Sequence, residues 1–361
     1  MQWTRKSIVI AVVLVAVVAG TAYAVATSRA PPDMCQGVAL GIPTEAASTG
    51  STPVAVLPDR SVDPAPAHPP PAVAPAADRA PAALAPIPVV AAENFWGSLV
   101  AQLGGNETSV LSIVTDPNAD PHEYEANTSD AQAIADAQLV IVNGVGYDQW
   151  ALDLIAADGN PGQTVLNVGE LNGVNVTGGI VSGNPHMWYD PVYVNRTVAA
   201  MYADLVEIRP SATASFAANY ATLNASLASL YGQAALIRES FAGTVVASTE
   251  SIFVYLANYT DLDLVSPPAF MEAIADGSDP SAQSIVQFEC QLQSGLVKVL
   301  VYNEQTVTPL TTNMKAIAAA HNVTVVGVTE TIQPPNVSFE SWMYGEYLDL
   351  ENALDAEALG R

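Results

Sequence analysis

Two histidines follow prolines in short motifs rich in acidic and aromatic residues. His122 lies in DPHEYE (residues 120–125) and His186 in NPHMWYDP (residues 184–191), in a chain with only four histidines. Two isolated carboxylates lie far downstream, Glu250 in STESIF and Glu330 in GVTETIQPP. Neutral imidazole is the commonest side-chain metal ligand, and carboxylates are hard anionic ligands. The four side chains together could bind one divalent metal ion, whose charge the two carboxylates would match.

The positions of these residues relative to predicted strands support a shared site. Glu250 follows the apolar run TVVAS, and Glu330 follows VTVVGV. In open α/β sheets, ligands bind outside the carboxyl ends of the strands. Another interpretation stays open on residues alone: loop histidines are often surface or capping groups, and glutamates favour helix N-termini because of the helix dipole.

Strand and helix patterns alternate through most of the chain beyond residue 87. Short apolar runs with strand character are separated by segments with helical spacing, which is typical of parallel sheets covered on both faces. We therefore predict an α/β fold with two lobes, each with a mostly parallel sheet flanked by helices: an N-terminal lobe (87–190) and a C-terminal lobe (241–361). Residues 191–240 between them are helical almost throughout, with a break at Pro210. Residues 211–240 would span about 45 Å as a helix, long enough to bridge both lobes.

The chain is strongly acidic. It has 36 Asp and Glu against 11 Lys and Arg, a formal net charge of −25. Nucleic-acid binding is excluded as a function class because phosphate contacts need basic patches. The negative field suits a protein that attracts cations, although solubility in a salty or acidic exterior explains the charge equally well.

The N-terminus predicts export. Residues 1–29 form a signal peptide or a membrane anchor, because the uncharged run 8–26 follows Arg5 and Lys6. We favour an uncleaved anchor, although A-x-A sequences leave cleavage open. Residues 30–86 are rich in Pro and Ala and predict a disordered linker. The predicted location is extracytoplasmic, at the cell surface.

Eight N-x-S/T sequons suggest a glycoprotein if the host glycosylates. They begin at Asn106, Asn127, Asn175, Asn195, Asn224, Asn258, Asn322 and Asn336.

The two cysteines show no metal-binding spacing. Cys290 lies in the apolar helical pattern IVQFECQL, so we expect a buried free thiol. A disulfide with Cys35 is disfavoured in this interpretation because it would tie a flexible segment to a domain.

Three motifs in this order resemble a known family. DPHEYE, NGVGYDQW (residues 143–150) and NPHMWYDP, with SFESWM after a TET turn, are similar to the cluster A-I solute-binding proteins of manganese, iron and zinc ABC transporters. The resemblance covers roughly residues 87–358. It implies two α/β lobes joined by a rigid backbone helix, and a metal ion (Mn, Fe or Zn) bound as cargo between them by His122, His186, Glu250 and Glu330. It also implies a monomeric receptor that delivers the metal to an ABC transporter permease.

Two departures from the zinc-specific members bear on the metal. Those members have a third histidine where this chain has Glu250, and often a histidine-rich loop where this chain has VNVTGGIVSGN. The resemblance therefore favours the manganese- or iron-type members, although zinc would still bind tightly. Manganese members usually carry Asp at the position of Glu330.

Neighbouring side chains are expected to support the four ligands. Asn143 and Tyr147 could orient His122 or the contact between lobes, and Asp190 could hold the second ring nitrogen of His186. His321 ends a helical pattern, and we interpret it as structural.

Two other functions compete with the receptor. A surface adhesion protein could keep the same fold, and a metal-dependent hydrolase could use the same ligands. The chain has no HExxH, GxSxG or glycine-rich phosphate loop, so we predict that it is not an enzyme.

Overall fold

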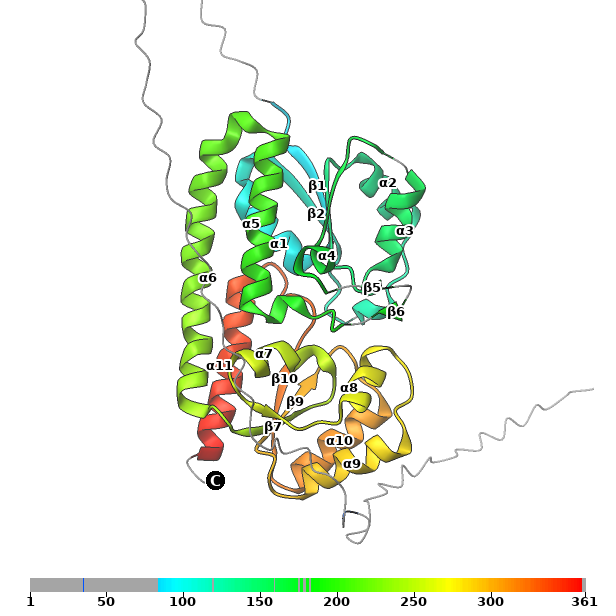
Figure 1. Cartoon of the computed structure of the whole chain (residues 1–361), viewed down its shortest axis with the longest axis vertical. Coiled ribbons are helices and arrows are strands. Elements are labelled where there is room, and N and C mark those ends of the chain that lie inside the picture. Colours follow the sequence, from blue (N-terminus) through cyan, green and yellow to red (C-terminus); the bar gives the residue numbers. More distant parts are fainter. Residues whose placement is uncertain are drawn as a thin grey trace, which may run out of the picture.

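Two four-stranded parallel sheets form the frames of two lobes (Figure 1). The computed structural model describes residue 35 and residues 84–358, apart from 119, 159, 175, 178, 179 and 182. The first sheet has the order β2-β1-β3-β4 and the second β10-β9-β7-β8. Their strands are β1 (Ile87–Glu93), β2 (Thr108–Val114), β3 (Leu139–Val142), β4 (Thr164–Asn167), β7 (Val245–Ser248), β8 (Asp263–Leu264), β9 (Val299–Asn303) and β10 (Thr324–Val328).

Each sheet is covered on both faces. Successive residues of a strand point to opposite sides of the sheet, so one strand contributes to two cores. In β1, Val89 and Ala91 join a large core with α1, α5 and α6, whereas Val90 and Ala92 join a smaller core with α2 and α3. Strand β9 alternates in the same way between the large core and a separate core beneath α9 and α10. The large core includes residues of both lobes, so the lobes are packed together along one side.

The helices follow the strands in both lobes, as the alternating pattern predicts. In the first lobe they are α1 (Asn94–Gly104), α2 (Thr128–Asp136), α3 (Gln149–Asp158) and α4 (Val168–Asn172). In the second they are α7 (Val254–Tyr259), α8 (Pro268–Ala275), α9 (Ala282–Gln293), α10 (Pro309–Ala320) and α11 (Phe339–Ala358). Sequence patterns did not indicate α8. A short antiparallel hairpin, β5 (Val176–Thr177) and β6 (Ile180–Val181), precedes the second histidine motif.

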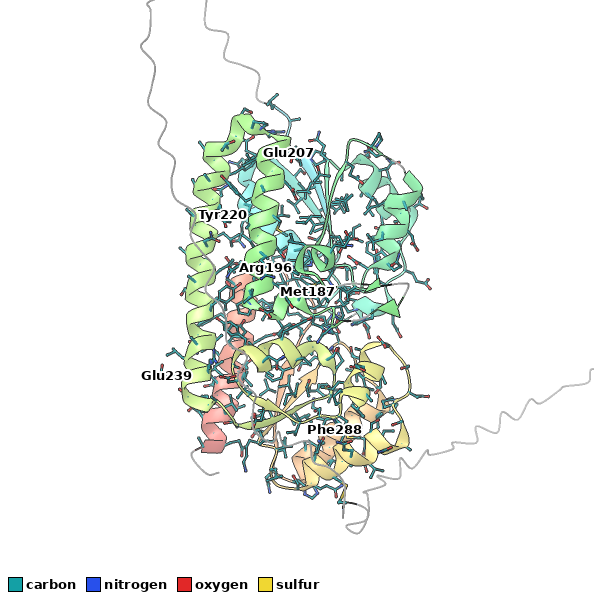
Figure 2. The ribbon with its side chains drawn as sticks, in the orientation of Figure 1. Met187, Arg196, Glu207, Tyr220, Glu239 and Phe288 are labelled. Carbon is teal, nitrogen blue, oxygen red and sulfur yellow. A yellow bond between two sulfur atoms is a disulfide. The ribbon has the colours of Figure 1, made fainter. Side chains whose placement is uncertain are left out.

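A long helix runs beside both lobes. Helix α5 (Pro191–Ile208) ends before a 3-10 turn at Pro210–Ala212, and α6 (Thr213–Phe241) then continues for 29 residues. Tyr220 of α6 lies at the level of the first lobe and Glu239 at the level of the second (Figure 2). Helix α6 packs against α1 and α5 at one end and against α11 further along. The predicted two-lobe α/β fold with one bridging helix is therefore confirmed.

The expected free thiol of Cys290 is wrong. Cys290, on α9, forms a disulfide with Cys35, and their Cα atoms lie 5.4 Å apart across a sequence separation of 255 residues. The length of the intervening chain is no obstacle, because the entropic cost of closing a loop grows only slowly with its length. The bond fixes Cys35 beside the second lobe.

The predicted N-terminal anchor and Pro/Ala-rich linker, Cys35 apart, lie outside the described residues over almost their whole length. Within residues 84–358, none of the helices has the length and apolar character needed to cross a membrane.

Candidate metal centre

The four predicted ligands meet between the lobes. His122 Nε2 lies 3.4 Å from Glu330 Oε2, and His186 Nε2 lies 3.3 Å from Glu250 Oε1 and 3.8 Å from Glu330 Oε2. Ligand atoms of His122, His186 and Glu250 all lie within 4.8 Å of one another. The structure thus brings together four residues spread over more than 200 positions of sequence.

Each ligand is positioned by the end of a regular element. His122 lies in a 3-10 turn, Pro121–Glu123, in the loop after β2, and Asp120 caps this turn by accepting a 2.9 Å hydrogen bond from the His122 amide. His186 directly precedes the 3-10 turn Met187–Tyr189. Glu250 and Glu330 follow β7 and β10 at the carboxyl edge of the second sheet. This is where sheet topology places ligands in α/β folds.

The ring of His186 has a defined tautomer. Asn184 Oδ1 lies 2.7 Å from His186 Nδ1 and also accepts a hydrogen bond from the His186 amide at 3.0 Å. A side-chain carbonyl oxygen can only accept, so Nδ1 carries the proton and Nε2 presents a lone pair. The role expected for Asp190 is therefore wrong: its carboxylate accepts from the Val192 amide and caps α5.

Both histidines direct an unsatisfied nitrogen into the site. The Nε2 atoms of His122 and His186 are buried and have no hydrogen-bond partner among the described residues. Unpaired buried polar atoms cost free energy, so a ligand that accepts their lone pairs is expected. Two imidazole nitrogens and two carboxylate oxygens fit a divalent transition metal ion.

The two carboxylates are buried among hydrogen-bond donors. Tyr147 Oη donates to Glu330 Oε2 at 2.7 Å and Ser251 Oγ to Glu250 Oε1 at 3.2 Å. Asn303 Nδ2 donates to the other oxygen of each carboxylate, Glu250 Oε2 and Glu330 Oε1, at 2.6 Å in both cases. These bonds fix the orientation of both side chains before any ion binds.

The electrostatics of the two glutamates differ although both are fully buried. Burial raises the pKa of Glu250, and the nearby Glu330 carboxylate raises it further. Burial also acts to raise the pKa of Glu330, but His122 and His186 in their protonated, metal-free form and the Tyr147 hydroxyl outweigh it and hold this pKa below its usual range. A bound divalent cation would favour ionisation of both groups.

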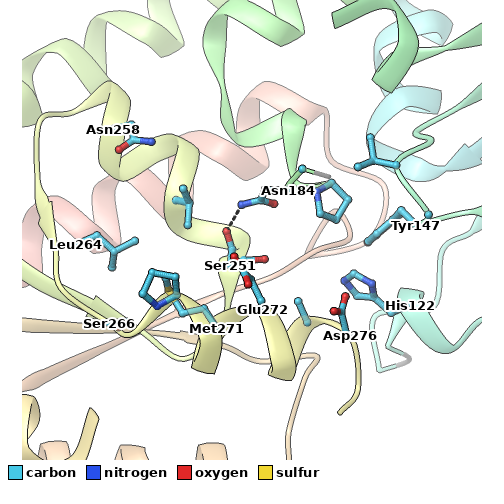
Figure 3. A pocket seen from close by; sticks show the side chains of 17 residues that line it. His122, Tyr147, Asn184, Ser251, Asn258, Leu264, Ser266, Met271, Glu272 and Asp276 are labelled. Carbon is cyan, nitrogen blue, oxygen red and sulfur yellow. Dashed lines mark hydrogen bonds between the residues drawn. The ribbon is translucent and has the colours of Figure 1, made fainter. Parts of the chain in front are cut away.

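A cavity of about 620 Å³ leads to the site. In Figure 3, His122 and Tyr147 lie on one side of it, and Leu264 and Ser266 on the other. The His122 side chain is 17% exposed, whereas His186, Glu250 and Glu330 are fully buried. His122 is therefore the one of the four that solvent reaches.

Sequence reasoning missed several groups at the site. Asn184 and Asn303 contact predicted ligands, and Asp120 forms a second possible metal-binding group with His122 and Glu330. Asn303 carried a usable signal, because it is a polar residue at the carboxyl end of the buried strand VLVYN. Asn143 and Tyr147 were expected to orient His122 or the contact between lobes. Tyr147 does join the lobes, through its hydrogen bond to Glu330. Asn143 instead accepts from Trp96 and donates to the Pro185 carbonyl.

The fold and these motifs agree with a family comparison. A family model described as zinc-uptake complex component A, periplasmic (ZnuA), matches residues 89–353. The chain belongs to this family. The match covers both lobes and all four candidate ligands.

Individual relatives of this ZnuA-family chain are distant. The manganese-binding lipoprotein MntA of Halalkalibacterium halodurans is 30% identical over 138 residues, which cover 36% of this chain and 43% of that protein. The chain thus matches less than half the length of that relative.

Solved structures share the fold over both lobes. The periplasmic zinc-binding protein TroA of Treponema pallidum is 16% identical with a TM-score of 0.62, over 74% of this chain and 98% of that one. The laminin-binding protein Lmb of Streptococcus agalactiae, described as an adhesin with metal-transporting activity, is 18% identical with a TM-score of 0.61, over the same shares. These likenesses show the fold of the ZnuA family.

Proposed function

We propose that this chain is an extracytoplasmic receptor that captures one divalent transition metal ion, Mn, Fe or Zn, and delivers it to an ABC importer. The observation that carries the proposal is the pair of buried, unpartnered Nε2 atoms of His122 and His186, which face the Glu250 and Glu330 carboxylates. Family membership and the metal-binding descriptions of its relatives support the same function.

Capture would begin at the solvent-accessible ligand. The cavity reaches His122, and we infer that a cation first binds there and then exchanges its remaining water for His186, Glu250 and Glu330. Because His122 lies in the first lobe and the glutamates follow strands of the second, the metal would hold the lobes together across α6. An importer could then distinguish the closed receptor from the open one.

The disulfide supports the extracytoplasmic location. Disulfides persist in oxidising environments and are rare in the cytosol. The Cys35–Cys290 bond therefore fits a protein that is exported by its N-terminal segment. Whether this segment anchors the chain or is cleaved decides how the receptor stays near the importer, and anchoring is our proposal.

Binding without turnover is the activity we propose. Four protein ligands that enclose the ion favour storage and transfer, whereas catalytic metal sites keep a coordination position for water. The adhesion alternative has weaker support, because the likeness to Lmb at 18% identity shows the fold alone.

Metal counting on the full chain tests the proposal. The protein is stripped with a chelator, loaded with Mn, Fe or Zn, freed of excess ion and analysed by mass spectrometry. We expect one equivalent in the wild type and in the matched control His321→Ala, and less than a tenth of this in His122→Ala and Glu330→Gln. Absence of bound metal in the wild type would refute the receptor, and retention in both site variants would refute the site.

Delivery to an importer needs a separate test. Cells of the source organism that lack the chain should take up less radioactive Zn or Mn from metal-limited medium, and the wild-type gene should restore uptake. Unchanged uptake with intact metal binding would contradict delivery and favour another use of the bound ion.

A further inference from the structure

A single amide group contacts both glutamates of the metal centre. Asn303 Nδ2 lies 2.6 Å from Glu250 Oε2, 2.6 Å from Glu330 Oε1 and 3.0 Å from Thr306 Oγ1. Asn303 is fully buried at the end of β9, and its Oδ1 accepts a 3.0 Å hydrogen bond from the Gln305 amide. This acceptor contact fixes which end of the amide faces the carboxylates, so the NH₂ group points at them.

In each carboxylate, one oxygen contacts the Asn303 amide and the other lies near a histidine nitrogen. Glu250 Oε2 and Glu330 Oε1 accept from Asn303, and both bonds join an amide donor to a carboxylate, which makes them stronger than neutral ones. The opposite oxygens, Glu250 Oε1 and Glu330 Oε2, accept from Ser251 and Tyr147, and they also lie 3.3 Å and 3.4 Å from histidine Nε2 atoms. Only one oxygen of each glutamate therefore faces the space between the histidines.

We propose that Asn303 is a specificity-determining residue that restricts Glu250 and Glu330 to one metal-binding oxygen each. This inference rests on the proposed metal-binding function. An NH₂ group has two hydrogens, and the two shortest of the three contacts of Asn303 Nδ2, both 2.6 Å, are to the carboxylates. With both glutamates monodentate, the four candidate ligands offer two nitrogens and two oxygens, a four-coordinate set in which Asp120 takes no part.

A four-coordinate set selects among the candidate metals. Zinc has no geometric preference from its d electrons and is stable with four ligands in a tetrahedral arrangement. Manganese prefers six oxygen-rich ligands in octahedral geometry, which two bidentate carboxylates would approach. Asn303 thus disfavours manganese beyond the general affinity order. Under this proposal the site prefers zinc, whereas the expectation from the sequence, which follows from the two carboxylates, is manganese- or iron-type cargo.

X-ray absorption spectroscopy on the metal-loaded full chain tests the coordination without any variant. We expect zinc bound by four N and O ligands, with one oxygen from each glutamate. A wild-type zinc site with five or six ligands and bidentate carboxylates would overturn the inference while leaving the receptor function intact.

Competition titrations test the specificity. In Asn303→Ala, we expect the ratio of the manganese Kd to the zinc Kd to fall by about tenfold, the lower end of the effects seen when a hydrogen-bond partner of a metal ligand is removed. Thr306→Val removes a longer 3.3 Å bond to Glu330 Oε1, together with the contacts of Thr306 Oγ1 to Asn303 Nδ2 and Asp120, but leaves both Asn303–carboxylate bonds in place and should shift the ratio less. Asn313→Ala, which removes a 3.4 Å amide bond to Glu289 on α9, is the matched control and should leave it unchanged.

The outcomes separate the two proposals. If Asn303→Ala folds and binds one metal equivalent with a Kd ratio within about twofold of the wild type, Asn303 has only a structural role and the inference fails alone, because a removed ligand partner should cost at least about tenfold. If Asn303→Ala does not fold, the wild-type spectrum and Thr306→Val decide. A wild type that binds no metal would refute the receptor and this inference together.

Discussion

Tyr147 of the first lobe donates a 2.7 Å hydrogen bond to Glu330 of the second, between residues 183 positions apart. The accepting oxygen, Glu330 Oε2, is also the one nearest to His122 Nε2. The ring of Tyr147 packs edge-on against His122, with ring centroids 4.6 Å apart. One tyrosine therefore joins the lobes and contacts a candidate ligand from each.

Replacing this hydroxyl should weaken metal binding without removing the site. In Tyr147→Phe we expect the Kd for zinc to rise about tenfold or more, because Glu330 loses the donor that orients its metal-facing oxygen. Dissociation should accelerate, since the contact between lobes is lost. Stopped-flow transfer of zinc to a chromogenic chelator measures both, and the exposed Tyr344→Phe is the control. Equal rates in the two variants would contradict this role.

The tautomer of His186 gives a second prediction. Asn184→Ala should raise the Kd for metal by about tenfold to a hundredfold, because Nδ1 loses the acceptor that keeps the proton off Nε2. Asp190→Asn should leave the Kd unchanged, since Asp190 caps α5 and asparagine caps equally well. Calorimetric titration measures both. An effect confined to Asp190→Asn would restore the role that sequence reasoning gave to Asp190.

The disulfide should stabilise the folded chain. Cys35→Ser is expected to lower the free energy of unfolding by about 2–5 kcal/mol, because the crosslink closes a long loop in the unfolded state. Cys290→Ser and the double variant should lose the same amount. Chemical denaturation measures the loss, and thiol titration of the denatured, unreduced wild type should find no free thiol. Two free thiols per chain would contradict the bond.

Glu346 should make stability depend on pH. Burial raises its pKa to about 7 from 4.5, although Tyr189, Thr329 and Trp342 donate hydrogen bonds to it. Between pH 4.5 and about 7 the folded state therefore binds more protons than the unfolded state. The free energy of unfolding should fall by about 3 kcal/mol as pH rises through this window and then level off.

Glu346→Gln isolates this contribution. Urea unfolding in excess chelator, at pH 5, 6, 7 and 8, should show a shallower fall in the variant than in the wild type, whatever its absolute stability. Other buried carboxyls such as Asp148 contribute equally to both proteins, so the difference of slopes belongs to Glu346. If the free energy of unfolding depended on pH equally in the two proteins, Glu346 would have the same pKa in the folded and unfolded states, which contradicts the prediction.

The sequence determined the kinds of residue at the centre and the elements that carry them. Apolar runs and helical spacing are local, so strand and helix alternation, the break at Pro210 and the long α6 were predictable. Glu250 and Glu330 were predictable at the carboxyl edge of the second sheet because each follows a parallel strand, and the family resemblance marked them as candidate ligands. The short helix α8, which begins at the second of two consecutive prolines, gave too brief a pattern to be recognised.

Only the tertiary structure decided which atoms meet. Asn184 beside His186, Asn303 between two glutamates and Cys35 beside Cys290 depend on distances between segments far apart in the chain. Hydrogen bonds and disulfides form over a few ångströms, and no local pattern encodes such proximity. The two carboxylates that indicate a manganese-type site by composition each have one oxygen in contact with Asn303, a contact that depends on the tertiary geometry and not on residue type.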